Sequence, residues 1–294
     1  MSGSSNNHDP KAAGTAQRSR VPTMEAAEII EAADEAAADD IPGVDAPPAP
    51  LPGTELALHI NNVTVDFDGF KALGGVDLRV QRGELRFLIG PNGAGKTTLI
   101  DIITGLAKPT TGTVHFNGQD ITRLREHRRV RLGIGRSFQT PTVFGSLTVV
   151  ENVDLAASFR RPMPSLFLRR HGMSSEVAAA IERVGLMDVS HRLAGQLSHG
   201  QKQWLEIGML LAQRPQLLLL DEPVAGMSTE ERLATGELLH ELAGDHTIIV
   251  IDHDMAFLRR FARKVTVLHE GKILAEGSVA EVQADDVVRE VYLG

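Results

Sequence analysis

From residue 55 onward, two kinds of segment alternate along the chain. Some are short continuous apolar runs, and in the others apolar residues recur at helical spacing. The runs LLLLD (217–221) and HTIIVID (246–252) are continuous, which is typical of parallel strands that are buried on both faces. Strands that alternate with helices favour a layered α/β domain. The pattern therefore predicts an α/β fold with a mainly parallel core sheet.

Other elements are predicted around these two runs. Strands are expected at LALHINNVTVDF (56–67), VDLRV (76–80), ELRFLIG (84–90), TVHFNG (113–118) and GIGRSF (133–138), and a closing hairpin at KVTVLHEG and KILAEG (264–277). Helices are expected at KTTLIDIITGL (96–106), over most of residues 149–213 with a break near Pro162 and Pro164, and from about Ser228. The domain thus contains a mostly helical insertion.

Residues 1–54 follow neither pattern. They are rich in Ala, Ser, Asp, Glu and Pro, and with nine acidic and three basic residues they carry most of the chain's net charge of −8. Such a segment buries too little apolar surface to offset the entropy lost on ordering, although MEAAEIIEAADEAAADD is a candidate for a helix induced by a partner. We expect residues 1–54 to be a disordered acidic tail and residues 55–294 to be the folded domain.

Charge and cysteine content narrow the function classes. Residues 55–294 carry little net charge, so they offer no broad positive field for nucleic acid. The chain has no cysteine, which excludes disulfides and thiol-ligated metals. No apolar run approaches the roughly 20 residues of a membrane span, and the first residues lack the apolar core of a secretory signal. We therefore expect a soluble, cytosolic protein.

The segment GPNGAGKT (90–97) fits the phosphate-binding pattern G-x-x-x-x-G-K-[ST] and lies between a predicted strand and a predicted helix. Its glycines allow backbone N–H groups to surround phosphate oxygens. Lys96 supplies a positive charge for the β- and γ-phosphates, and Thr97 supplies a hydroxyl ligand for Mg²⁺. This segment predicts a nucleoside triphosphate site.

Two acidic residues stand at the end of the first buried run, where Asp221 closes the strand and Glu222 follows. We expect Asp221 to reach Mg²⁺ through water, because Mg²⁺ tends to keep several waters. We expect Glu222 to polarise the water that attacks the γ-phosphate. The separation of 125 positions from Lys96 to Asp221 leaves room for the helical insertion.

The segment LSHGQ (197–201) begins a predicted helix. Ser198 and Gln201 have the spacing of a capping box, which satisfies the unpaired N–H groups of a helix start. The same N–H groups and the helix dipole also make a helix start an anion site. The local residues alone leave both interpretations open.

Taken in order, these segments resemble the ATP-binding-cassette (ABC) ATPases. LSHGQ is similar to the LSGGQ signature of that family, and LLLLDEP (217–223) follows it as the family requires. Gln139 in SFQTP resembles the Q-loop glutamine, which senses Mg²⁺ and the membrane partner. His253 in VIDHDM resembles the switch histidine, and Phe67 lies where an aromatic ring stacks on adenine.

The resemblance implies a fold for residues 55–294. It is a P-loop NTPase domain of the ABC ATPase type, with a mainly parallel core sheet, an antiparallel β subdomain and an inserted α-helical subdomain. The helical subdomain would span about 140–213, and a C-terminal family extension would span about 270–294.

The resemblance also implies roles for single residues, with ATP and Mg²⁺ as ligands. The catalytic residues would be Lys96, Gln139, Glu222 and His253, and the metal-binding residues Thr97, Gln139 and Asp221. ATP would contact Phe67, Gly90, Pro91, Asn92, Gly93, Ala94, Gly95, Lys96, Thr97, Thr98, Ser198, Gly200 and Gln201. In this family the signature helix start binds the γ-phosphate of ATP held by the opposite subunit, so Ser198 and the Gly200 backbone would be donors.

Two positions depart from the family pattern. His199 replaces the first signature glycine, and Ser228 stands where many members carry an aspartate. The histidine either crowds the phosphate or points outward. Gly200, where close approach of the backbone is needed most, is retained.

At finer resolution, FQTPTVFGSLTVVENV (138–153), DEPVAGM (221–227) and EVYLG (290–294) resemble the branched-chain amino-acid importer branch. LSHGQKQWLEIGMLLAQ (197–213) and QTPTVF (139–144) are most similar to its urea-transporter ATP-binding subunit. The resemblance implies a peripheral subunit at the cytoplasmic face of the inner membrane. It would pair with a second ATP-binding subunit, identical or not, beneath transmembrane permease subunits. An external solute-binding protein would deliver solute to these permease subunits.

Urea is the solute that this resemblance favours. A branched-chain amino acid or a short amide is the alternative, and a lipopolysaccharide-export ATPase of the same branch is a second one. A cassette protein that acts on ribosomes or DNA is disfavoured, because the chain has one cassette and no long coiled coil, and because its acidic balance suggests no nucleic acid partner.

Three other segments have open interpretations. Pro141, Val143 and Phe144 are equally compatible with docking of a membrane partner and with packing inside the subdomain. FRRPMPSLFLRR (159–170) suits either lipid headgroups or a partner, or a solvated surface. Asp252-His253-Asp254 is a poor metal site, because adjacent residues leaving a strand rarely converge on one ion.

Overall fold

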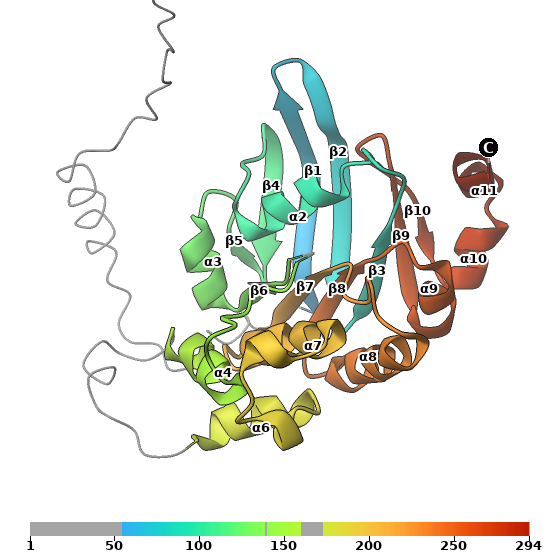
Figure 1. The fold of residues 1–294 in the computed structure, drawn as a ribbon. Coiled ribbons are helices and arrows are strands. Elements are labelled where there is room, and N and C mark those ends of the chain that lie inside the picture. Colours follow the sequence, from blue (N-terminus) through green and yellow to red (C-terminus); the bar gives the residue numbers. More distant parts are fainter. Residues whose placement is uncertain (1–54, 139, 160–172, 294) are drawn as a thin grey trace, which may run out of the picture. The chain divides into compact units, whose positions relative to one another are not determined.

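The computed structural model describes residues 55–138, 140–159 and 173–293, which form two β-sheets and their surrounding helices (Figure 1). The predicted tail over residues 1–54, the expected break near Pro162 and Pro164, and most of the arginine-rich segment 159–170 lie outside the described residues. Within the described ranges, none of the helices has both the length and the apolar character that crossing a bilayer requires.

The core sheet has six strands in the order β10-β9-β3-β8-β7-β6. Their bounds are β3 Leu85–Ile89, β6 Ile134–Arg136, β7 Leu217–Asp221, β8 Thr247–Ile251, β9 Lys264–His269 and β10 Lys272–Gly277. Strands β9, β3, β8, β7 and β6 pair in parallel, whereas β10 pairs antiparallel with β9. All residues of β7 and β8 are buried, as their apolar runs predict, and so are all residues of β3, including Arg86. The mainly parallel core is therefore confirmed.

The second sheet is antiparallel, with the strand order β2-β1-β4-β5. Its strands are β1 Leu56–Phe67, β2 Phe70–Gln81, β4 Thr111–Phe116 and β5 Gln119–Asp120. Helix α2 (Lys96–Thr104) packs between the two sheets, because its buried side chains share one hydrophobic cluster with residues of both. This packing fixes the start of α2, and with it the loop over residues 90–97.

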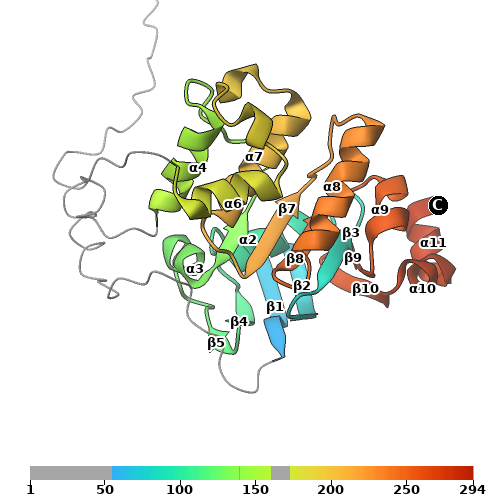
Figure 2. The same ribbon diagram turned by 90° about the horizontal axis from the view of Figure 1, so that it is seen from below.

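Helices cover the opposite face of the core sheet, where alternate residues of β3, β7 and β8 join a second hydrophobic cluster. The helices on this face are α4 Val149–Ser158, α6 Ser175–Arg183, α7 His199–Leu211, α8 Thr229–Leu242, α9 Met255–Phe261, α10 Val279–Ala284 and α11 Asp286–Leu293. Helix α3 (Glu126–Leu132) instead packs against α2 and β6. Two short 3₁₀ helices, η1 (Met187–Val189) and η2 (Ala194–Gln196), precede α7. Helices α4, α6 and α7 pack against one another within the predicted helical insertion (Figure 2).

Sequence patterning missed α3, α9, α10 and α11. Each has only six to eight residues, too few for a helical repeat to stand out from the surrounding loops. The strand expected at residues 76–80 is also longer, since β2 begins at Phe70. The expected strand over residues 133–138 is shorter, with three residues paired in β6.

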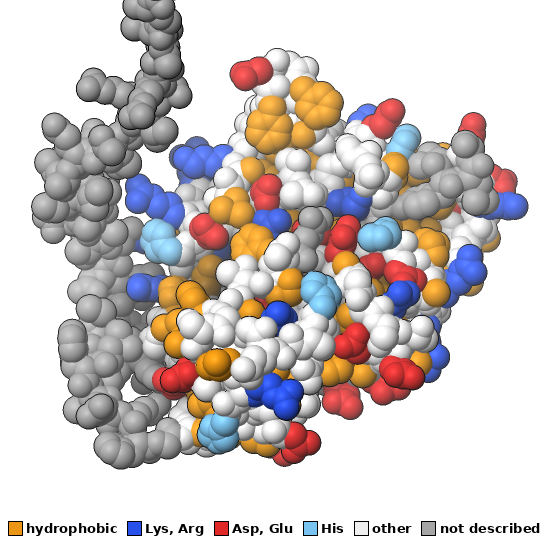
Figure 3. Space-filling view, in the orientation of Figure 1, with side chains coloured by type: hydrophobic (Ala, Val, Ile, Leu, Met, Phe, Trp, Pro, Cys, Tyr) orange, Lys and Arg blue, Asp and Glu red, His pale blue; other side chains and the backbone are white. Residues whose placement is uncertain are grey.

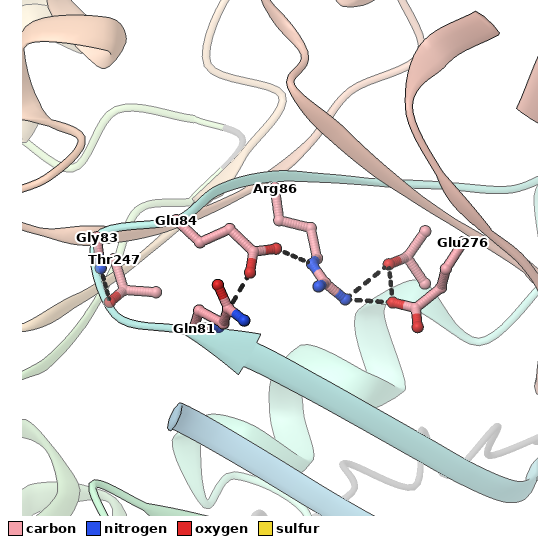
Figure 4. A network of polar contacts seen from close by, with 7 residues as sticks. Gln81, Gly83, Glu84, Arg86, Thr247 and Glu276 are labelled. Carbon is pink, nitrogen blue, oxygen red and sulfur yellow. Dashed lines mark hydrogen bonds and ion pairs between the residues drawn. The ribbon is translucent and has the colours of Figure 1, made fainter. Parts of the chain in front are cut away.

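A buried arginine ties β3 to the C-terminal hairpin (Figure 4). Arg86 is fully buried, and its guanidinium group donates to Oε1 of Glu84 at 2.5 Å, to the Thr266 hydroxyl at 3.1 Å and to the Glu276 carboxylate. A buried charge needs such partners, because an unpaired one costs several kcal/mol. The network therefore fastens β9 and β10 to the strand that leads into the loop over residues 90–97.

Candidate functional site

The loop over residues 90–97 leaves β3 and enters α2, as predicted. The Lys96 ammonium group donates hydrogen bonds to the carbonyl oxygens of Gly90 and Pro91, at 2.6 and 3.0 Å. Burial lowers the pKa of Lys96, while the Glu222 and Asp221 carboxylates act to raise it. The Lys96 side chain therefore folds back onto its own loop. It also interacts electrostatically with Asp221 and Glu222 at the end of β7.

Two glycines of this loop occupy places that no side chain fits. Gly95 has a φ of 100°, and a Cβ there would lie 2.8 Å from the carbonyl oxygen of Ala72 in β2. A Cβ at Gly90 would collide with the carbonyl oxygen of Leu268 in β9. The close approach of these two glycines to β2 and β9 thus holds the loop between the two sheets.

Asp221 is the last residue of β7 and is 8% exposed. Its Oδ2 lies 3.8 Å from Nη2 of Arg136, whose Nη1 pairs with Asp101 at 2.5 Å. Burial raises the pKa of Asp221, and the Arg136 charge opposes that rise. A separation of 3.8 Å is too long for a hydrogen bond, so the carboxylate keeps acceptor capacity for another ligand.

Glu222 and His253 come together where β7 and β8 end. The Glu222 N–H donates to the carbonyl oxygen of Ile251 at 2.7 Å, and Nδ1 of His253 lies 3.3 Å from Oε1 of Glu222. Glu222 has a φ of 51°, which is uncommon for a non-glycine residue. The His253 side chain is 78% exposed. The predicted base and the predicted switch histidine are therefore neighbours at an open edge.

Phe67 lies at the tip of the β1–β2 hairpin, opposite Phe70. The turn between them consists of Asp68 and Gly69, both with positive φ, as tight hairpins require. The two phenylalanines are 53% and 67% exposed, and Figure 3 shows hydrophobic side chains at this tip. Phe67 thus has a ring face free for stacking. Gln139, the predicted Q-loop residue, lies outside the described residues.

Ser198 caps α7, which confirms the capping-box interpretation. Its hydroxyl accepts from the Gln201 N–H at 3.1 Å, and the Gln201 side chain accepts from the Ser198 N–H at 3.1 Å. The Ser198 hydroxyl also donates to Oε1 of Glu231 at 3.3 Å. The capping box engages the N–H groups of Ser198 and Gln201 but not those of His199 and Gly200, so the anion-site role is compatible with it and stays a prediction.

The two departures from the family pattern have structural roles. Nε2 of His199 lies 3.1 Å from the Ala225 carbonyl oxygen, so the histidine points toward the turn after β7. Ser228 caps α8, because its hydroxyl accepts from the Glu231 N–H and the Glu231 carboxylate accepts from the Ser228 N–H. Both residues therefore stabilise the region where α7 and α8 begin.

Sequence reasoning missed Glu206, a buried acid of α7. Its Oε1 accepts from the backbone N–H groups of Phe138 at 3.5 Å and Thr142 at 3.3 Å, on either side of position 139. Burial raises the pKa of Glu206 to about 7, and the two N–H groups oppose that rise. The only signal in the sequence is a charged residue at an apolar position of an amphipathic helix.

The raised pKa of Glu206 predicts a pH-dependent stability. At pH values between the ordinary pKa of 4.5 and the folded value of about 7, the carboxyl group of Glu206 is protonated in the folded chain but ionised in the unfolded chain. The free energy of unfolding gained from this proton is therefore lost as pH rises through about 7. Glu206→Gln removes this titration. Urea unfolding at several pH values measures the free energy of unfolding of the native chain and of the variant. The difference between the two, native minus variant, should fall by about 2 kcal/mol from about pH 5.5 to about pH 8. A difference that is independent of pH would contradict this prediction.

The segment that was equally compatible with docking of a membrane partner and with subdomain packing divides into exposed and packed residues. Phe144 is 49% exposed, and the buried Asn152 side chain holds its backbone N–H and carbonyl oxygen at 2.8 and 3.1 Å. Val143 instead packs against the hydrophobic cluster beneath the helices. The exposed Phe144 side chain, on a backbone held by Asn152, suits docking of a membrane partner. Val143 belongs to the packing of the subdomain.

Asp254, next to His253, acts as a helix cap. Its Oδ1 accepts from the N–H groups of Ala256 and Phe257 at the start of α9, and its Oδ2 pairs with Arg232 at 2.7 Å. Within the described ranges, no three His, Asp or Glu side chains are grouped closely enough to hold a metal ion by themselves.

Comparison with known proteins places this geometry in context. The ABC transporter family matches residues 73–225, and a family described as branched-chain amino acid ATP-binding cassette transporter matches residues 272–294. The high-affinity branched-chain amino acid transport ATP-binding protein BraF of Pseudomonas aeruginosa is 34% identical over 81% of this chain and 97% of its own length.

Solved structures agree with the sequence comparison. The ADP conformation of an ATP-binding cassette of an ABC transporter matches with a TM-score of 0.73 and 34% identity, over 82% of this chain and 100% of its own. A dimeric post-hydrolysis state of another ATP-binding cassette, bound to ADP and phosphate, matches with a TM-score of 0.61 and 27% identity, over 76% and 98% of the two chains.

Proposed function

Because this chain belongs to the ABC transporter family and is an ATP-hydrolysing member of it, we propose that it is the subunit that powers solute import through transmembrane permease subunits. The observation that carries the catalytic assignment is the 3.3 Å approach of Glu222 and His253 beside the phosphate-binding loop. Lys96 pairs with the phosphates of ATP, Glu222 accepts a proton from the attacking water, and His253 contacts the γ-phosphate.

The oxygen donors at this edge fit Mg²⁺. The Asp221 carboxylate keeps acceptor capacity beside Arg136, and Thr97 offers a hydroxyl from the first turn of α2, which are the hard ligands that Mg²⁺ prefers. Gln139 is the third proposed ligand. Bound Mg²⁺ neutralises charge on the β- and γ-phosphates.

The proposed catalytic unit is a dimer in which each ATP is enclosed by two subunits. Ser198, Gly200 and Gln201 at the start of α7 bind the γ-phosphate of ATP held by the partner subunit, while Phe67 stacks on the adenine held by its own subunit. Support comes from the start of α7, where the capping box engages the N–H groups of Ser198 and Gln201 but not those of His199 and Gly200, and from the dimeric state of one similar cassette. The partner is a second copy or a related ATP-binding subunit.

We place the subunit at the cytoplasmic face of the inner membrane as a peripheral protein. The exposed Phe144, on a backbone clamped by Asn152, is the proposed contact for the permease. An external solute-binding protein delivers the solute, and nucleic acid takes no part.

The proposed solute is a branched-chain amino acid. Its support is the match of residues 272–294 to the branched-chain family and the name of BraF. Urea is the competing candidate, and it rests on the similarity of LSHGQKQWLEIGMLLAQ and QTPTVF to urea-transporter subunits. A lipopolysaccharide-export role has no comparable support.

Solute uptake separates these candidates. A deletion strain complemented with the native chain should take up labelled leucine at least about tenfold faster than the same strain complemented with Lys96→Ala, because loss of the loop charge removes phosphate binding. Labelled urea under nitrogen limitation is measured in parallel. Faster urea uptake with unchanged leucine uptake would overturn the branched-chain assignment in favour of urea, and unchanged uptake of both would reject both solutes.

A further inference from the structure

The carboxylate of Glu231 lies against the start of α7, although Glu231 belongs to α8. Its Oε1 accepts a hydrogen bond from the Ser198 hydroxyl at 3.3 Å, and a Cβ added at Gly200 would lie 2.5 Å from the same oxygen. Its Oε2 accepts from the Ser228 N–H at 2.9 Å. One carboxylate thus joins the caps of two helices that begin 30 positions apart.

Contacts on both sides of Glu231 hold the two helices together. Nε2 of His199 lies 3.1 Å from the Ala225 carbonyl oxygen, ahead of α8. One turn further along, the Trp204 indole N–H donates to the Thr235 hydroxyl at 2.9 Å, and that hydroxyl donates to the Glu231 carbonyl oxygen at 2.8 Å. Glu231 is therefore held against α7 by the packing of the helices and by its own cap.

Glu231 and an incoming phosphate require the same groups. A helix start attracts one negative charge through its dipole and its N–H groups, and the Ser198 hydroxyl has a single proton to donate. In the structure that proton goes to Glu231. A phosphate bound by Ser198 and the Gly200 backbone must take this proton and must approach a carboxylate of like charge.

We propose that Glu231 is an internal anion that holds Ser198 until the γ-phosphate of ATP on the partner subunit displaces it. This inference rests on the proposed role of the signature helix start across the dimer. Glu231 is a positioning residue: it keeps the Ser198 hydroxyl and the start of α7 ordered, and its charge raises the ATP concentration that closes the dimer.

Glu231→Gln tests the proposal in the transporter complex purified with the full-length chain. Glutamine at this position keeps the capping box and the acceptor for Ser198 but removes the charge. The KM for ATP should fall roughly two- to tenfold while kcat changes less than about twofold, because only the competition with phosphate is relieved. A role in stability alone would leave KM unchanged or raise it.

The matched control is Glu281→Gln, which makes the same change in the capping box of α10, formed with Ser278. Its KM should equal that of the native chain. An unchanged or higher KM for Glu231→Gln, at a melting temperature equal to the native one, would overturn the internal-anion proposal. If Ser198→Arg also leaves turnover intact, the proposed dimer itself fails; if Ser198→Arg abolishes turnover, only the role of Glu231 fails.

Discussion

Replacing Glu222 with glutamine should reduce steady-state ATP hydrolysis by at least about 100-fold, because the amide cannot accept a proton from the attacking water. Glutamine has the same shape as glutamate, and a φ of 51° is equally unfavourable for both residues. The turn after β7 should therefore stay intact. ATP binding should persist, and ATP should remain bound in a closed dimer. The measurements are phosphate release by the purified complex and retention of labelled ATP after gel filtration.

Glu237→Gln is the control for this prediction, since Glu237 is an exposed acid of α8 far along the helix from its cap. It should hydrolyse ATP at the native rate. If Glu222→Gln turned over ATP within about twofold of the native chain, Glu222 would not be the base, and its 3.3 Å contact with His253 would be a structural one.

Replacing Ser198 with arginine should abolish ATP hydrolysis by the assembled complex while the isolated chain still binds ATP. The arginine side chain removes the hydroxyl donor and fills the space in front of the start of α7, where the partner's phosphate would lie. The phosphate-binding loop belongs to a different part of the fold, between β3 and α2, so nucleotide affinity of the single chain should change little. Fluorescent-nucleotide titration and phosphate release measure the two quantities.

Part of the Ser198→Arg effect could come from loss of a helix cap, which costs about 1 kcal/mol. Ser278→Arg removes the equivalent cap of α10 and serves as the matched control. It should leave turnover intact. Native turnover in the Ser198→Arg complex would refute the role of α7 across the dimer.

Much of the site follows from the sequence because parallel strands end at a common edge. The apolar runs of β7 and β8 fix where those strands stop, and the polar residues directly after them must then lie side by side. The proximity of Glu222 and His253 is a consequence of that geometry. The loop over residues 90–97 is equally predictable, since its pattern joins a strand to a helix.

The contacts that link helices were not predictable in this way. The S-x-x-E spacing of Ser228 and Glu231 predicts the cap of α8, but nothing local indicates that Glu231 also meets Ser198, 33 positions away. The same holds for Glu206, whose partners Phe138 and Thr142 lie more than 60 positions earlier. Such contacts depend on how α7 packs over the core sheet, which a periodic pattern does not specify.

The direction of His199 shows the same limit. From the sequence, an imidazole in place of a glycine was compatible either with crowding of the phosphate or with an outward orientation. The structure turns it toward the Ala225 carbonyl oxygen, at 3.1 Å. The decisive factor is a hydrogen-bond acceptor on a turn 26 positions later.

Catalysis by two chains around one nucleotide is tested most directly by the rate of ATP hydrolysis as the purified chain is diluted at saturating MgATP. The activity per molecule should fall in proportion to the concentration of the chain or of its partner subunit, because neither completes a γ-phosphate site alone. A specific activity that stays constant down to extreme dilution would contradict it.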